Sequence, residues 1–130
     1  MGLLDLLKEI KEGWEDVGIR DFTKQQSVTV QFYNYNGLLK NLKMLHRLED
    51  ELIETIDNSR VGIYDGHEVE SPDLIDGKLY MFGPNAEDLY KAVKPILDNT
   101  LWLHGAQATL RFGPLNDQKT KLIDVPIGPQ

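Results

Sequence analysis

Hydrophobic residues in the first half of the chain follow two periods, one helical and one extended. Residues 3–17 place leucines, Ile10 and Trp14 at spacings of three and four, which predicts an amphipathic helix. Residues 27–35 alternate between apolar and polar positions, as in a strand that is buried on one face. A leucine stripe of helical period then runs from Leu38 and predicts a long helix ending near Asn58.

The second half of the chain adds three strands and one more helix, so that two strand–helix–strand units lie at 28–64 and 78–112. The pattern predicts a short strand, a second strand, a helix and a final strand, at residues 61–64, 78–82, 85–97 and 107–112. Asp65-Gly66 is expected to stop the short strand, and Asn85 to cap the helix. Pro95 is expected to kink that helix or help to end it. Residues 119–125 are compatible with a short edge strand.

The order strand, helix, strand, strand, helix, strand is that of the ferredoxin-like βαββαβ fold. We therefore expect an α+β domain in which two helices cover one face of a four-stranded antiparallel sheet. A chain of 130 residues suits one domain. Its expected parts are an N-terminal helix at 1–18, a ferredoxin-like core at 27–114 and a C-terminal extension at 115–130.

This fold leaves one sheet face without helices, and strand alternation predicts which side chains lie there. The expected residues of this open face are Tyr33, Tyr64, Tyr80, Phe82 and Arg111. Soluble monomers seldom leave so many aromatic rings uncovered. Three occupants remain open: the amphipathic helix at 3–17, a second copy of the chain in a homodimer, and a ligand or peptide.

Charge changes this picture because it is concentrated in one segment. The chain has a net charge of −7, and residues 49–76 hold ten acids against the single base Arg60. This segment would repel nucleic acids and anionic membranes and attract a basic protein. The more common role of such a charge run is a solvated surface that keeps the protein soluble.

Several function classes find no support in the composition. The absence of cysteine excludes disulfides and thiolate chemistry. The three serines lie in no nucleophile motif, and the glycines match no phosphate-binding loop. The N-terminus does not have the pattern of a signal peptide, and no stretch is apolar enough to span a membrane. We expect a cytoplasmic protein without cofactor, metal, nucleic-acid partner or membrane association.

The run Asp65-Gly-His-Glu68 is the short motif whose side chains are best suited to metal binding or catalysis. A histidine beside two carboxylates suits a divalent metal or a general base with an orienting acid. The spacing matches no known metal motif, and a simple turn with His67 and Glu68 in solvent is the preferred explanation. The sequence leaves both readings open, and no metal-binding or catalytic residue is assigned.

Three runs resemble small single-domain bacterial proteins that have no agreed activity. These runs are GIYDGHE at 62–68, LYMFGPNAEDLYKAVKPIL at 79–97 and LRFGP at 110–114, about half of the chain. The resemblance implies a shared fold and carries no catalytic residue to this chain.

The leading hypothesis is a non-enzymatic binding or regulatory module whose acidic segment 49–76 meets a basic protein, as immunity and antitoxin proteins do. Its candidate contact residues are Glu51, Glu54, Asp65, Glu68, Glu70 and Asp73. One alternative is a small dimeric enzyme that acts on an apolar or aromatic molecule, for which Tyr33, Tyr64, Tyr80, Arg111 and His67 would have to converge. Another is a structural homodimer formed through the open face.

Overall fold

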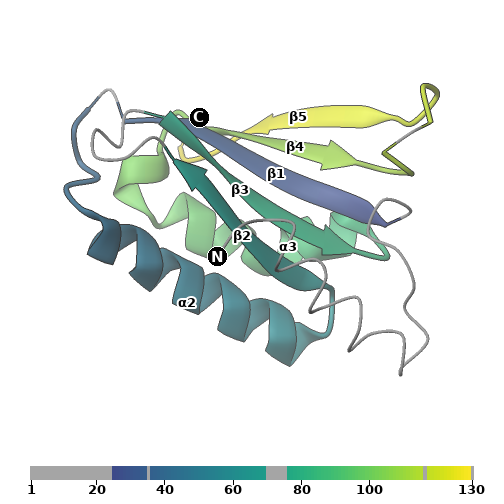
Figure 1. Ribbon diagram of the computed structural model, residues 1–130, viewed down its shortest axis with the longest axis horizontal. Helices are drawn as coiled ribbons and strands as arrows, with labels where there is room; N and C mark the ends of the chain where they lie inside the picture. The colour runs from purple at the N-terminus through teal and green to yellow at the C-terminus, as the bar shows by residue number, and fades with distance from the viewer. Residues whose placement is uncertain (1–24, 35, 70–75, 116, 130) are drawn as a thin grey trace.

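A computed structural model describes residues 25–34, 36–69, 76–115 and 117–129. This part of the chain forms five strands, two α-helices and one 3₁₀ turn (Figure 1). In chain order they are β1 (Gln26–Tyr33), α2 (Leu42–Ser59), β2 (Ile63–Val69), β3 (Asp76–Gly83), α3 (Ala86–Asp98), η2 (Leu101–Leu103), β4 (Gln107–Arg111) and β5 (Leu122–Pro126). The helix expected at 3–17 lies outside the described residues.

The five strands form one antiparallel sheet in the order β2-β3-β1-β4-β5. The predicted α+β class is confirmed, and the first four strands with α2 and α3 are compatible with a ferredoxin-like arrangement. The sheet has one strand more than the four expected, because β5 pairs with the outer side of β4. This strand overlaps the segment 119–125, where the sequence is compatible with a short edge strand, and ends one residue beyond it.

Both helices pack on the same face of the sheet and enclose the core (Figure 1). Strand β1 alternates as predicted, with Val28, Val30 and Phe32 fully buried toward the helices. The leucine stripe of α2 and the apolar face of α3 close over them, through Leu45, Leu48, Leu52, Ile56, Leu89, Val93 and Leu97. Each such side chain contributes roughly 1.5–3 kcal/mol by leaving water.

Helix α2 begins at Leu42, four residues later than the leucine stripe suggested. The side-chain amide of Asn34 bridges the backbone of Leu39, accepting from its N–H at 3.1 Å and donating to its carbonyl at 2.8 Å. This clasp holds the segment in a loop, and Asn41 then caps the helix by accepting from the Met44 N–H at 3.0 Å.

Helix α3 has the N-cap that the sequence predicted. The side chain of Asn85 accepts from the Asp88 N–H at 3.0 Å. Pro95 lies inside the helix, which ends at Asp98, and the Pro95 carbonyl accepts from the Asn99 N–H at 3.1 Å. The proline therefore comes one turn before the end of the helix.

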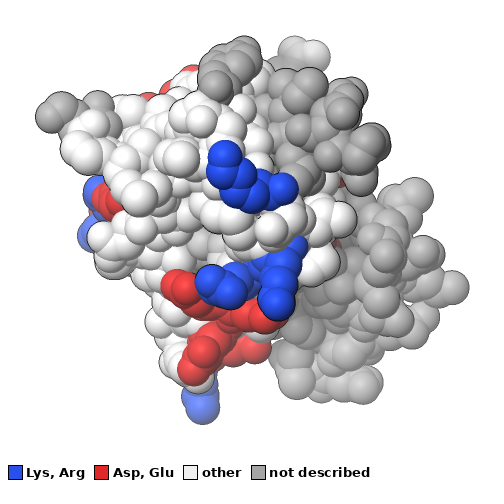
Figure 2. Space-filling view, turned by 90° about the vertical axis from the view of Figure 1, so that its left-hand side faces the viewer, with Lys and Arg blue, Asp and Glu red and all other residues white. Residues whose placement is uncertain are grey.

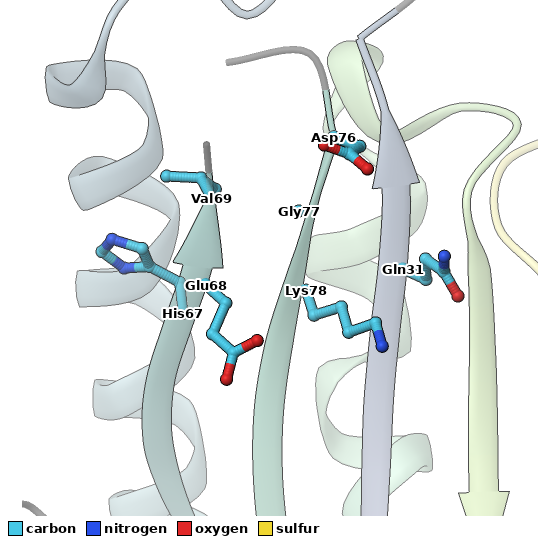
Figure 3. A pocket seen from close by; sticks show the side chains of 7 residues that line it. All are labelled: Gln31, His67, Glu68, Val69, Asp76, Gly77 and Lys78. Atoms are coloured by element: carbon cyan, nitrogen blue, oxygen red, sulfur yellow. The ribbon is translucent and has the colours of Figure 1, made fainter. Parts of the chain in front are cut away.

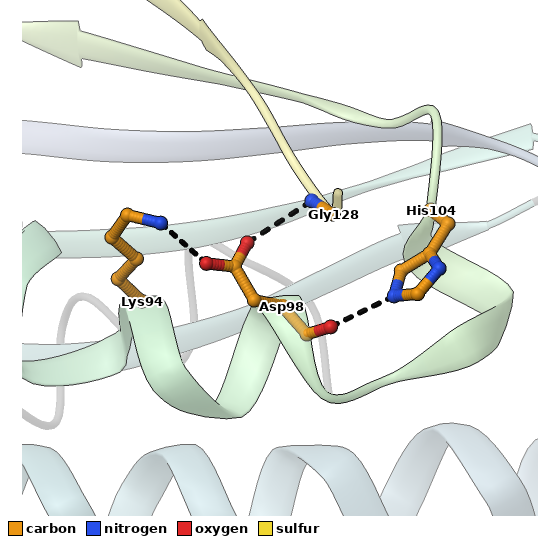
Figure 4. Close-up of polar contacts among 4 residues, drawn as sticks. All are labelled: Lys94, Asp98, His104 and Gly128. Atoms are coloured by element: carbon orange, nitrogen blue, oxygen red, sulfur yellow. Dashed lines mark hydrogen bonds and ion pairs between the residues drawn. The ribbon is translucent and has the colours of Figure 1, made fainter. Parts of the chain in front are cut away.

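The end of α3 also anchors the C-terminal strand (Figure 4). The Asp98 carboxylate accepts from Lys94 and, at 3.0 Å, from the Gly128 N–H, while His104 Nε2 donates to the Asp98 carbonyl at 2.8 Å. These donors, Lys94 first, hold the pKa of Asp98 below its usual value. The contacts seat the buried Ile127 against the core and position β5 on the sheet.

Candidate functional site

Strand β2 contains the Asp65-Gly66 pair, which forms a β-bulge instead of the turn that the sequence predicted. The pairing of β2 with β3 shifts register between Tyr64 and Gly66, and the strand then continues to Val69. Gly66 has a φ of 115°, which glycine adopts without a Cβ clash. The expectation that the strand stops at Tyr64 is therefore wrong.

The bulge decides which side chains of β2 face α2. Tyr64 and His67 pair with Met81 and Leu79, two fully buried residues of the core face. Three positions apart, they would face opposite ways in a regular strand, but the extra bulge residue places both on the helix side. The prediction of Tyr64 on the open face is thus wrong, because its hydroxyl donates a hydrogen bond to a buried residue of α2.

That partner is Glu49, whose carboxylate is shared by two donors from β2. Its Oε2 accepts from the Tyr64 hydroxyl at 2.7 Å and lies 2.9 Å from His67 Nδ1. Burial first, and the neighbouring Glu49 charge second, hold the pKa of Tyr64 far above its usual value. The ring of His46, one turn before Glu49, lies 6.1 Å from that of His67 between centroids.

This arrangement orients the His67 imidazole. The contact between Nδ1 and the Glu49 carboxylate holds the ring in one orientation, as an acid does for a histidine in an oriented histidine–carboxylate pair. Within the described ranges, no group of three or more His, Asp or Glu side chains is placed to hold a metal ion. Sequence reasoning missed Glu49, although its spacing from Leu45 and Leu52 puts it on the core side of α2.

Asp65 occupies the bulge and is 1% exposed, with no hydrogen bond to either carboxylate oxygen. Burial raises its pKa to about 7. A buried carboxylate without partners is costly when charged. Asp65 does not lie on an accessible surface, so the structure does not support it as a contact residue for a partner.

The remaining residues of the predicted open face do lie opposite the helices. Tyr33, Tyr80, Phe82 and Arg111 occupy strand positions that alternate with the buried core residues. Arg111 is 7% exposed; its Nε donates to Ser27 Oγ at 3.0 Å, and its two terminal nitrogens have no hydrogen bond. The five residues required by the enzyme alternative are thus divided between the two faces of the sheet.

A hollow of about 410 Å³ opens at the end of this face (Figure 3). It is lined by Gln31, His67, Glu68, Val69, Asp76, Gly77 and Lys78. Glu68 and Lys78 project from neighbouring strands to the same side, whereas His67 turns away toward α2. Glu68, predicted to meet a protein partner, therefore belongs to this sheet hollow.

The exposed side of α2 carries an acidic stripe that we define as Asp50, Glu51, Glu54 and Asp57. All four side chains are exposed, and none of them takes part in an ion pair among the described residues. Figure 2 shows one larger group of acidic side chains that is bordered by basic ones, with smaller acidic areas at the edges of the view. The predicted contact residues Glu51 and Glu54 belong to this stripe, whereas Glu70 and Asp73 lie outside the described residues.

Beside the stripe, α2 and the segment after α3 form an apolar groove of about 270 Å³. It is lined by Met44, Arg47, Leu48, Glu51, Asn99, Thr100, Leu101 and Trp102. Leu101 is 67% exposed, and Glu51 belongs to both groove and stripe. The apolar groove thus lies next to the acidic stripe.

Comparison with known proteins places no external constraint on these sites. No family model, curated protein or solved structure matches this chain. In the part of the chain that the structure describes, no helix is long and apolar enough to cross a membrane.

Proposed function

We propose that this chain is a ferredoxin-like binding module that docks a basic protein partner on the acidic stripe and the adjoining groove. The proposal follows the mode of small acidic proteins that neutralise basic effectors by steering and occlusion. It rests above all on one observation: the exposed charges of α2 are arranged against the stability of their own helix.

The helix macrodipole favours acids at the N-terminus and bases at the C-terminus. Helix α2 has no acid in its first turn and no base in its last, where Asp57 lies instead. Asp50 and Glu54 stand four residues apart, and such like-charge pairs cost about 0.2–0.5 kcal/mol each. A basic partner would relieve this repulsion, so the arrangement is better suited to binding than to folding.

The groove supplies apolar contact area, which the charged stripe alone does not provide. Charged rims chiefly accelerate encounter and select partners, whereas buried apolar anchors carry much of the binding energy. The exposed Leu101 and the neighbouring Trp102 form part of a groove that can receive such an anchor, and Glu51 lines the same groove. The partner is thus expected to present an apolar side chain flanked by lysines or arginines.

The first test neutralises the stripe in a single variant that carries Asp50→Asn, Glu51→Gln, Glu54→Gln and Asp57→Asn. A matched control changes the net charge equally elsewhere, through Glu87→Gln, Asp88→Asn, Asp117→Asn and Asp124→Asn. The wild type and the control should retain a basic protein from a cell lysate in a salt-dependent manner, and the stripe variant should lose it. Equal recovery by the stripe variant, or recovery of no basic protein at low salt, would contradict the proposal.

A second test separates the groove from the stripe with two leucines of equal exposure. Leu101 and Leu115 are each 67% exposed, but only Leu101 lines the groove. Leu101→Ser should weaken capture of the same partner about tenfold, in line with the loss of one apolar anchor, while Leu115→Ser leaves it unchanged.

A further inference from the structure

The sheet hollow has features of a small-molecule site that are independent of α2. It lies on the open face at the ends of β1, β2 and β3, so three adjacent strands supply its walls. Its volume of about 410 Å³ falls within the range of known ligand pockets. Side chains on strands of a packed sheet are held more precisely than side chains on loops.

Among the described residues, the Lys78 ammonium of the hollow takes part in no ion pair. Glu68 and Lys78 are directly opposite in the β2–β3 pairing, where opposite charges ordinarily attract. The ion pairs of the described residues nevertheless do not include this couple. Figure 3 shows the Lys78 chain leaning toward β1, away from Glu68. Its ammonium therefore remains available to an external carboxylate.

Two tyrosines lie beside the polar groups of the hollow. Gln31 Nε2 donates to the Tyr33 hydroxyl at 2.7 Å. Partial burial first, and the nearby Glu68 carboxylate second, raise the pKa of Tyr80 to about 12, so its phenol stays protonated as a donor. The Gln31 side chain is held before any ligand arrives, and such preorganisation lowers the entropic cost of binding.

The charges of the described lining define the ligand. Glu68 and Asp76 contribute two carboxylates and Lys78 one ammonium, which leaves one negative charge in excess. A complementary molecule carries one carboxylate and two cationic groups.

We propose that the sheet hollow binds a basic α-amino acid of the lysine or arginine type. The ligand carboxylate pairs with Lys78, and its two cationic groups lie at Glu68 and Asp76. This inference does not depend on the docking of a protein at α2, because no residue is shared between the hollow and the acidic stripe.

Calorimetric titration of the full chain with L-arginine and L-lysine tests the proposal. At least one of them should bind saturably, with a dissociation constant below about 1 mM. Cadaverine, which lacks the carboxylate of lysine, and norleucine, which lacks its side-chain charge, should each bind about tenfold more weakly. Saturation by neither amino acid up to about 10 mM, or equal binding of cadaverine and lysine, would overturn the proposal.

Two variants assign the contacts. Lys78→Met should weaken binding of the amino acid about tenfold and remove the preference for lysine over cadaverine. Asp76→Asn should reduce the preference for lysine over norleucine. Lys119→Met removes an exposed lysine outside the hollow and should bind as the wild type does. Unchanged affinity in Lys78→Met would refute the assignment, and thermal melting confirms that each variant folds.

Discussion

The buried carboxylate of Asp65 makes a prediction about how stability depends on pH. Asp65 is 1% exposed in the bulge of β2 and has no hydrogen-bond partner, and burial raises its pKa from 3.8 to about 7. Asp65→Asn keeps the shape of the side chain and removes its charge. The difference in unfolding free energy between the wild type and this variant therefore isolates the contribution of the carboxylate.

The direction of the effect follows from proton uptake in the two states. Below about pH 4 the carboxyl is protonated both folded and unfolded, and its charge costs nothing. Between about pH 4 and 7 the unfolded chain releases the proton while the folded chain keeps it, so stability falls as pH rises. Raising the pKa from 3.8 to about 7 corresponds to a penalty of about 2–4 kcal/mol, which applies in full above pH 7.

Urea unfolding between pH 4 and 8, followed by tryptophan fluorescence, to which the buried Trp102 contributes, measures this difference. The stability of the wild type relative to Asp65→Asn should fall by about 2–4 kcal/mol across the range. Asp50→Asn removes the same charge from an exposed position and shows how much of any slope comes from the acidity of the whole chain. A difference between wild type and Asp65→Asn that stays constant across the range would refute the reasoning.

Three further predictions concern stability and are checked by urea unfolding at pH 7. Tyr64→Phe removes a donor to a buried carboxylate and should cost about 1.5–3 kcal/mol, whereas Tyr33→Phe, at a 43% exposed position, should cost less than about 0.5 kcal/mol. Gly128→Ala should cost more than Gly105→Ala: both have positive φ, but a Cβ at 128 would lie 2.9 Å from a histidine ring, and one at 105 meets nothing. Arg111→Met should raise stability by about 1 kcal/mol by removing a buried charge whose terminal nitrogens lack partners; equal or lower stability would contradict this.

Much of the fold was predictable because its signals are local and repeated. The alternation of Val28, Val30 and Phe32 predicted the buried face of β1, and the leucine stripe of α2 predicted its packing side. Asn85 was recognisable as a cap because an acid follows three residues later. In each case several residues indicated the same local structure, so a single atypical residue did not change the predicted element.

Strand β2 was not predictable in the same way because its structure depends on a partner strand. Asp-Gly is a common turn pair, and only the pairing with β3 shows that it forms a bulge within a continuous strand. The facing of Tyr64 then depends on Glu49, fifteen positions earlier in the chain. Strand alternation predicted Tyr64 on the open face, away from the helices. Hydrophobic periodicity contains no information about a buried hydrogen bond, so it could not indicate the helix-facing side.

The two edge strands of the sheet, β2 and β5, carry features that affect pairing with a strand of another chain. An exposed edge strand invites pairing with another chain, and proteins oppose this with bulges, buried charges and proline. Strand β2 has the bulge and the buried Asp65, and β5 ends at Pro126. Both edges thus carry features that oppose strand addition, which agrees with our proposals that place binding on side chains of the two faces. The acidic stripe of α2 and the sheet hollow, the two proposed binding surfaces, lie on opposite layers and share no residue, so the two proposed ligands would not compete for the same side chains.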